Sequence, residues 1–187
     1  AVVTDDHEIM LAVRDGEVDK LGILFKRHSK HLYNFLRMGI GDREACEDLV
    51  QDVFLRMLKY RHTYRDNAGF MVWMFTIARN ARADWFRQHG TAHEPIESHE
   101  DAVWYDPAGE DESVNDAEMS RVRKALARLP EDMRDLLVLS KFKNMRYRDI
   151  GSLLNCSEGA VKVRIFRAMR ELKAVFHGLR GVDANGV

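Results

Sequence analysis

The sequence predicts an all-α protein: two small helical domains joined by a flexible acidic linker. Apolar residues recur at helical spacing on both sides of the middle of the chain, and no clean period-2 strand pattern occurs. Of the three prolines, Pro95 and Pro107 lie in the middle stretch. That stretch is too long for a loop inside one compact domain. We therefore expect helical domains at residues 1–90 and 116–187, with a linker at residues 91–115.

Charge is distributed unevenly along the chain, although the formal net charge is only −1. Residues 91–118 contain ten acidic and no basic residues. Residues 119–187 contain 15 basic and 7 acidic residues, whereas residues 1–90 are nearly balanced. Such asymmetry indicates that the C-terminal part binds nucleic acid and that the middle has a different role.

Two further features favour a cytoplasmic protein. No apolar run approaches the roughly 18–20 residues that a membrane-spanning helix needs, so we do not expect a membrane protein. Cys46 and Cys156 lie far apart within apolar helical patterns. A structural disulfide is therefore not expected, and a reducing compartment fits best.

Four helices are predicted in the first domain, at Asp6–Arg14, Val18–Met38, Arg43–Tyr60 and Phe70–Gln88. Asp42 is a plausible N-cap of the third helix. That helix has one apolar stripe, formed by Cys46, Leu49, Val50, Val53, Phe54 and Met57. Its other face carries Asp48, Gln51, Asp52 and Leu55. This face is either simply solvated or, because Leu55 lies among carboxylates, a docking surface for a protein.

The fourth helix lacks a properly polar side. Its predicted core stripe is Phe70, Met74, Ile77, Ala81 and Trp85. The remaining surface alternates aromatic and basic residues: Met71, Trp73, Phe75, Arg79, Asn80, Arg82, Phe86 and Arg87. Such a surface suits unpaired bases, which stack on aromatic rings while arginines bind phosphates. The alternative is that Phe75 and Phe86 pack against neighbouring helices.

The second domain is predicted to contain a helix–turn–helix. Its helices are expected at Asp116–Arg128, Glu131–Lys143, Tyr147–Leu154 and Glu158–Phe176. Ser157 is placed to cap the last helix. That helix has a core stripe of Val161, Ile165, Ala168, Met169, Leu172 and Phe176. Its outer face presents Gly159, Val163, Phe166, Arg167 and Arg170, flanked by Lys162, Arg164 and Lys173. This pattern is typical of a helix that enters the DNA major groove; the alternative is a basic, solvated helix.

Covalent chemistry is not expected of this chain. His28 and His31 are three residues apart, with no third metal ligand nearby in sequence. Glu47, Asp48 and Asp52 lack the base or ligand partners that a metal-dependent nuclease needs. We therefore predict no enzymatic activity, no catalytic residue, no metal or other cofactor, and no small-molecule substrate.

Three motifs in order resemble the extracytoplasmic-function (group 4) bacterial sigma factors of the sigma-70 family. They are "LYNFLRMGIGDREACEDLVQDVFLRML", "FMVWMFTIARNARADWF" and "LARLPEDMRDLLVLSKFKNMRYRDIGSLLNCSEGAVKVRIFRAMREL". The resemblance implies an alternative sigma factor that binds core RNA polymerase and directs promoter-specific initiation. It identifies residues 1–90 with sigma domain 2 and residues 116–187 with sigma domain 4.

The resemblance also implies roles for individual residues. Docking on the clamp helices of the largest polymerase subunit would involve Asp48, Gln51, Asp52 and Leu55. Recognition and melting of the minus-ten element would involve Arg65, Asn67, Trp73, Arg79, Asn80, Asp84 and Arg87. Reading of the minus-thirty-five duplex would involve Ser157, Glu158, Gly159, Lys162, Val163, Arg164, Phe166, Arg167 and Arg170. Val163 stands where the family often has Ser, which predicts an apolar contact such as a thymine methyl.

The partners implied by the family are core RNA polymerase (through its clamp helices and flap region), promoter DNA and an anti-sigma factor. The protein is expected in the cytoplasm, at the nucleoid when active, or held at the inner membrane by the anti-sigma factor. For the acidic linker two roles stay open: a soluble spacer, or a polyanion that occupies a basic channel of polymerase. The strongest rival hypothesis for the whole chain is a stand-alone helix–turn–helix regulator that binds duplex DNA without polymerase. A protein-interaction adaptor is a weaker third hypothesis, against which the basic C-terminal part speaks.

Overall fold

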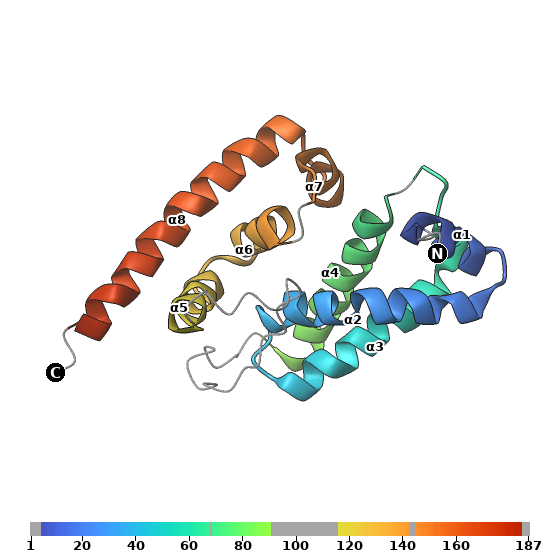
Figure 1. The fold of residues 1–187 in the computed structure, drawn as a ribbon, viewed down its shortest axis with the longest axis horizontal. Coiled ribbons are helices and arrows are strands. Elements are labelled where there is room, and N and C mark those ends of the chain that lie inside the picture. The colour runs from blue at the N-terminus through green and yellow to red at the C-terminus, as the bar shows by residue number, and fades with distance from the viewer. Residues whose placement is uncertain (1–4, 68, 91–115, 143–144, 185–187) are drawn as a thin grey trace. The chain divides into compact units, whose positions relative to one another are not determined.

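The structure is a computed structural model that describes residues 5–67, 69–90, 116–142 and 145–184. Every element in these ranges is helical, and the chain divides into two compact units, Ala1–His93 and Glu94–Val187 (Figure 1). The predicted all-α class with two helical domains is confirmed. The acidic linker predicted at residues 91–115 lies outside the described residues. Within the described ranges, no helix combines the length and apolarity needed to cross a bilayer.

The N-terminal unit contains four α-helices: α1 (Asp6–Arg14), α2 (Leu21–Arg37), α3 (Arg43–Lys59) and α4 (Phe70–His89). Short 3-10 turns at Val18–Lys20 and Arg61–Thr63 precede α2 and follow α3. The helix predicted from Val18 therefore starts with a tighter turn before its α-helical part. The side chain of Asp42 accepts hydrogen bonds from the backbone amides of Glu44 and Ala45, at 2.9 and 3.2 Å, which confirms the predicted N-cap.

The core of this unit forms where α3 packs against both α2 and α4. All six residues of the predicted α3 stripe are buried. The α4 stripe is buried at Phe70, Met74, Ile77 and Ala81, whereas Trp85 is only half-buried.

The expected aromatic and arginine surface of α4 is wrong at two positions. Phe75 is buried and meets the ring of Phe35 edge-on, with centroids 5.1 Å apart. Arg82 is also buried, and its guanidinium carbon lies 4.7 Å from the centroid of the same ring. A cation over an aromatic face is attracted to the ring's electrons, so Phe35 holds both residues in the core. The alternative that Phe75 packs against a neighbouring helix is confirmed.

The C-terminal unit contains α5 (Asp116–Ala127), α6 (Glu131–Leu137), α7 (Tyr147–Leu154) and α8 (Glu158–Ala184). The helix predicted to start at Glu131 continues from α6 into a π-helical turn at Val138–Phe142. A π turn is wider than an α turn. Residues 134–140, from α6 into the π turn, are all buried, so this stretch is covered on every side rather than along one stripe.

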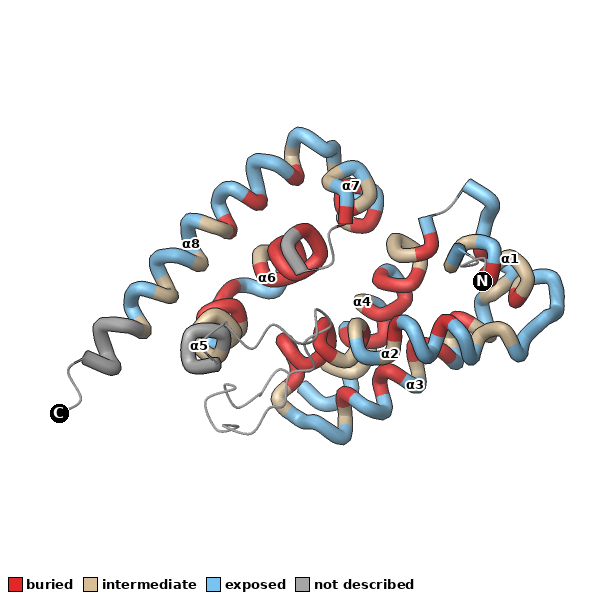
Figure 2. The backbone as a smooth tube through the Cα atoms, viewed as in Figure 1, coloured by how far each residue is buried: buried red, intermediate tan, exposed pale blue. Residues whose placement is uncertain are grey.

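Helix α8 packs against α5, α6 and α7 and is longer than predicted. Its early turns place a buried residue toward the unit at regular intervals and leave the other side exposed (Figure 2). The predicted end at Phe176 is wrong because no proline follows it, and half-buried Leu179 continues the apolar spacing for another turn.

Candidate nucleic-acid interface

A tight turn joins α7 to α8 and fixes how α8 is presented. Helix α7 ends at Leu154, and Asn155, which caps it, adopts the left-handed conformation with φ of 53°. The amide of Cys156 donates to the carbonyl of Gly151 at 2.8 Å. A Cβ on Gly151 would lie 2.6 Å from the carbonyl oxygen of Cys156, so this close approach requires glycine. The Ser157 hydroxyl accepts from the amide of Ala160 at 3.1 Å, which confirms the predicted cap of α8.

The two faces of α8 have opposite character. In the predicted core stripe, Val161, Ile165 and Ala168 are buried against the rest of the unit, whereas Met169, Leu172 and Phe176 are only half-buried. The side chains of Val163 and Phe166 are 51% and 72% exposed. The other residues predicted to read duplex DNA are exposed as well: Ser157, Glu158, Gly159, Lys162, Arg164, Arg167 and Arg170. All nine predicted residues are therefore accessible: Ser157 at the cap, and the others in the first half of α8.

Two interactions organise the edge of this face. Lys162 Nζ pairs with Glu158 at 3.4 Å, one helical turn earlier. Arg164 donates from Nη1 to the sulfur of Cys156 at 3.7 Å. Glu158 thus offsets the charge of Lys162 at the start of the helix, and the cations farther along α8 dominate the exposed face.

The predicted docking surface on α3 is accessible but not uniform. Asp48 and Gln51 are exposed, and Leu55 is 65% exposed. Asp52 is half-buried and accepts a hydrogen bond from Nε of Arg56 at 2.8 Å. Three of the four predicted residues therefore present their side chains to solvent, while Asp52 is engaged within the helix.

Arg56 also reaches from α3 to α4, a link that the sequence analysis missed. Its Nη1 donates to Oδ2 of Asp84 at 2.6 Å, and Asp84 pairs in turn with Arg87. The hydrogen bond from Arg56 lowers the pKa of the Asp84 carboxyl. The four-residue spacing from Asp52 to Arg56 is a signal for the first half of this chain of charges. The contact from Arg56 to Asp84 depends on how α3 packs against α4, and sequence spacing alone does not predict that packing.

A groove of about 520 Å³ lies between the first half of α3 and the last turns of α4. Arg56, Trp85, Gln88 and His89 line part of the groove. Its lining also includes five carboxylates, which belong to Asp42, Glu44, Asp48, Asp52 and Asp84. Clustered carboxylates repel DNA phosphates and attract basic groups. This side of the unit is therefore suited to a protein partner rather than to a nucleic-acid backbone.

The segment before α4 carries two of the remaining predicted residues, and α4 itself carries the others. Arg65 and Asn67 are exposed, whereas Tyr64 is buried. The Tyr64 ring meets the half-buried ring of Trp73 edge-on at a centroid distance of 5.1 Å. This contact places the loop of residues 64–67 (the 64–67 loop) beside the first turns of α4. Farther along α4, Asn80 and Arg87 are exposed, and Arg79 is half-buried.

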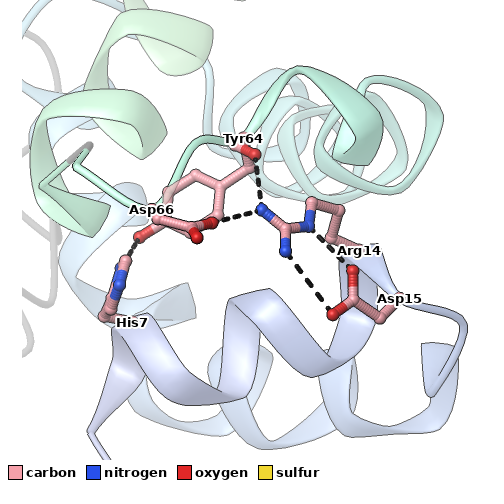
Figure 3. Close-up of polar contacts among 5 residues, drawn as sticks. All are labelled: His7, Arg14, Asp15, Tyr64 and Asp66. Carbon is pink, nitrogen blue, oxygen red and sulfur yellow. Dashed lines mark hydrogen bonds and ion pairs between the residues drawn. The ribbon is translucent and has the colours of Figure 1, made fainter.

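The 64–67 loop is also tied to α1, through residues that the sequence analysis did not single out. Nδ1 of His7 lies 2.7 Å from the Tyr64 hydroxyl, and Arg14 donates to Asp66 at 2.6 Å (Figure 3). His28, considered above as a zinc ligand, instead lies 2.7 Å from Oδ2 of Asp6 on α1.

Comparison with known proteins decides the family. Residues 24–91 match the model "Sigma-70 region 2", and residues 119–172 match "Sigma-70, region 4". The chain is 34% identical over 161 residues to RNA polymerase sigma factor CarQ of Myxococcus xanthus, covering 86% of this chain and 91% of CarQ. It is 27% identical over 164 residues to the ECF RNA polymerase sigma factor SigM of Bacillus subtilis, covering 86% and 96%. The chain belongs to the extracytoplasmic-function sigma factors.

As a member of this family, the protein is an alternative sigma factor that directs promoter-specific transcription initiation. Its fold is also that of solved structures. The structure of CnrH in complex with the cytosolic domain of CnrY has a TM-score of 0.70 at 24% identity, covering 97% of this chain and 99% of CnrH. The sigma factor RpoE in complex with the anti-sigma factor NepR, from Bartonella quintana, has a TM-score of 0.64 at 22% identity. That likeness covers 83% of this chain and 96% of RpoE.

Proposed function

We propose that this sigma factor divides promoter recognition between its two domains, residues 1–90 and 116–187. The first would recognise and melt the minus-ten element, and the second would read the minus-thirty-five element as duplex DNA. The observation that carries the proposal is the outer face of α8, where Val163 and Phe166 are 51% and 72% exposed among cationic side chains. Neighbouring apolar groups that are exposed and surrounded by polar residues mark interaction sites.

On this face, charge and apolar groups have separate tasks. Arg167 and Arg170 are the side chains that can bind guanine O6 and N7 in pairs of hydrogen bonds or neutralise phosphates. Val163 and Phe166 are suited to thymine methyl groups. Ser157, Glu158 and Gly159 lie at the helix start, with Lys162 and Arg164 on the next turn, where the backbone of a bound duplex passes.

The minus-ten element would be handled by the 64–67 loop and α4. Arg65 and Asn67 would contact bases from the loop, and Trp73 would stack on a base released by strand separation. Arg79, Asn80 and Arg87 would bind the phosphates and base edges along α4. We assign Asp84 an indirect part: it pairs with Arg87 and would orient that guanidinium toward DNA.

Polymerase docking would use Asp48, Gln51, Asp52 and Leu55 on α3. An exposed leucine beside the acidic groove supports a partner surface that combines apolar and basic groups. We assign this role to the clamp helices of the largest polymerase subunit, with the flap region as the partner of the C-terminal domain. A stand-alone DNA regulator is not favoured, because it would leave the region 2 match at residues 24–91 without a role.

An anti-sigma factor is the proposed negative regulator. The solved relatives named above include RpoE bound to the anti-sigma factor NepR, which supports a partner of this class. Such a protein would hold the sigma factor inactive in the cytoplasm by covering its polymerase-binding surfaces. We propose no catalytic activity for the chain itself.

Run-off transcription with purified core RNA polymerase tests the proposal. Full-length protein should bind core and direct initiation from promoters selected from genomic fragments of the host. Leu55→Ala should weaken core binding, whereas Arg167→Ala should leave core binding intact and reduce promoter use. A chain that binds duplex DNA but neither binds core nor starts transcripts would overturn the proposal in favour of the stand-alone regulator.

A further inference from the structure

One side chain of α1 holds the two residues that flank Arg65. Nη1 of Arg14 donates to Oδ1 of Asp66 at 2.6 Å and to the backbone carbonyl of Tyr64 at 3.4 Å (Figure 3). Because one bond goes to the residue before Arg65 and the other to the residue after it, Arg14 restricts the backbone in between. Asn67 directly follows Asp66, so its position depends on the same contact.

The loop is anchored below by Tyr64, which is 1% exposed. Its hydroxyl lies 2.7 Å from Nδ1 of His7, and its ring packs edge-on against Trp73. Burial raises the pKa of Tyr64 to about 12, so the hydroxyl stays protonated at neutral pH and can donate to Nδ1. Helix α1 therefore contacts the loop through His7 on its first turn and Arg14 on its last.

Arg14 is held in place on its own helix. Its Nε and Nη2 donate to the two carboxylate oxygens of Asp15 at 2.8 and 3.5 Å. This hydrogen bond from Arg14 lowers the pKa of the Asp15 carboxyl. Asp15 ends α1, and its backbone amide donates to carbonyls of that helix. The guanidinium is therefore oriented from the helix end toward the loop rather than free to rotate.

We propose that Arg14 is a positioning residue for minus-ten recognition, which acts through Asp66 and Tyr64 on Arg65 and Asn67. An unrestrained exposed loop loses conformational freedom when it binds DNA, and that loss weakens binding. A loop fixed beforehand avoids this loss and presents one geometry to the bases. Arg14 thereby sets both the affinity and the base selectivity of a site that it does not contact. The inference rests on the proposed role of the loop.

The test uses holoenzyme reconstituted with the full chain and a fluorescent single-stranded oligonucleotide of the minus-ten element. The element comes from a promoter that the wild-type holoenzyme transcribes. Arg14→Ala should weaken binding of the cognate oligonucleotide about two- to fivefold, the range expected for loss of one accessible ion pair. Discrimination between cognate and base-substituted oligonucleotides should fall as well, while core affinity and minus-thirty-five duplex binding stay unchanged. Arg14→Lys, which keeps a charge to pair with Asp66, should retain part of the selectivity.

Asp66→Ala separates positioning from a direct charge effect. If Arg14 only attracted phosphates, removal of the Asp66 carboxylate would tighten DNA binding. Positioning predicts the opposite: Asp66→Ala weakens binding, and the double variant with Arg14→Ala is no weaker than either single variant, because both changes break one contact. Lys20→Ala is the matched control, since Lys20 pairs with Glu17 at 2.8 Å. It should leave selectivity at the wild-type value.

Two further variants distinguish failure of the inference from failure of the proposed loop function. Arg65→Ala and Asn67→Ala should reduce binding of the cognate oligonucleotide. If they do and Arg14→Ala has no effect, or if Asp66→Ala tightens binding, the positioning role is overturned alone. If neither Arg65→Ala nor Asn67→Ala changes binding, the recognition role of the loop is lost and the inference is lost with it.

Discussion

Arg56 of α3 and Asp84 of α4 form an ion pair of 2.6 Å between side chains that are each about one-third exposed or less. The same guanidinium holds Asp52 at 2.8 Å. Asp52 belongs to the proposed polymerase-binding surface, and Asp84 holds an arginine of the proposed minus-ten surface. The two surfaces are therefore joined by one side chain in the wall of the acidic groove.

Arg56→Ala should lower the free energy of unfolding by about 1 kcal/mol, because it removes a partly shielded pair that joins two helices. The lowered pKa of Asp84 gives the pH dependence. The stabilisation is present above the unfolded carboxyl pKa of about 3.9 and is lost as pH falls through the lower folded value. Urea unfolding of both proteins should therefore give a difference at neutral pH that shrinks in strong acid. Arg43→Ala, which removes the exposed Arg43–Glu47 pair at 3.0 Å, should lower the free energy of unfolding by less. An equal loss would show that the link from Arg56 to Asp84 stabilises the fold no more than an exposed pair within one helix does.

Trp73→Ala should impair strand opening more than duplex binding. Stacking of a base on an aromatic side chain contributes about 1–3 kcal/mol, and only unpaired bases can use it. Permanganate reactivity of thymines measures opening, and binding to a minus-thirty-five duplex provides the comparison. Since Trp73 also packs against Tyr64, Trp73→Phe serves as the control that keeps a ring. Wild-type opening in Trp73→Ala would reject the stacking role.

Arg167→Ala should weaken binding to the minus-thirty-five duplex by about 1–3 kcal/mol if the guanidinium contacts a base. The loss should be large on the cognate duplex and small on a shuffled one, measured by fluorescence anisotropy at fixed salt. An equal loss on both sequences would instead assign Arg167 to phosphate binding. Lys173→Ala, on the flank of the same helix, tests how much of the effect is charge alone.

Gly151→Ala should destabilise the C-terminal domain by about 1–3 kcal/mol. The new Cβ would lie 2.6 Å from a backbone oxygen, so the turn between α7 and α8 must shift. Gly178→Ala in α8 is the matched control, because nothing lies within 4 Å of its Cβ position. That change should raise stability by about 0.5–1 kcal/mol. Thermal unfolding followed by circular dichroism compares them, and equal stabilities would show that the turn tolerates a side chain.

Cys46 and Cys156 should differ sharply in reactivity. Burial raises the pKa of the Cys46 thiol to about 12, so little thiolate exists at neutral pH and reagents cannot reach it. Cys156 is half-buried in the turn before α8. Alkylation followed by mass spectrometry should modify Cys156 in the native protein and Cys46 only after denaturant is added. Native labelling of Cys46 at a comparable rate would mean that the α2–α3 core opens readily.

Several features that depend on local spacing were predicted correctly. The α3 stripe and the caps at Asp42 and Ser157 follow from spacing and local hydrogen bonding, and the structure has all of them. The outer face of α8 follows from the same rule, because one buried stripe fixes which residues must lie opposite.

Prediction failed where a residue's environment depends on a distant partner. Arginine is usually a surface residue, and the ring of Phe35 that Arg82 meets in the core lies 47 positions earlier in the sequence. Arg14 and Asp66 are separated by 52 positions, so no local pattern pairs them. The π turn after α6 inserts a wider turn into an otherwise helical pattern, and no proline or glycine in residues 138–142 marks it.

The length of α8 has a practical consequence. Helix α8 is continuous over 27 residues, which at 1.5 Å per residue corresponds to a rod of about 40 Å. Only its first turns can enter a groove, so its far end stays well outside any bound duplex. A fluorophore near that end would move with the recognition face and leave its contacts untouched. With a second dye on the DNA, energy transfer between the two dyes would report when the sigma factor releases the promoter.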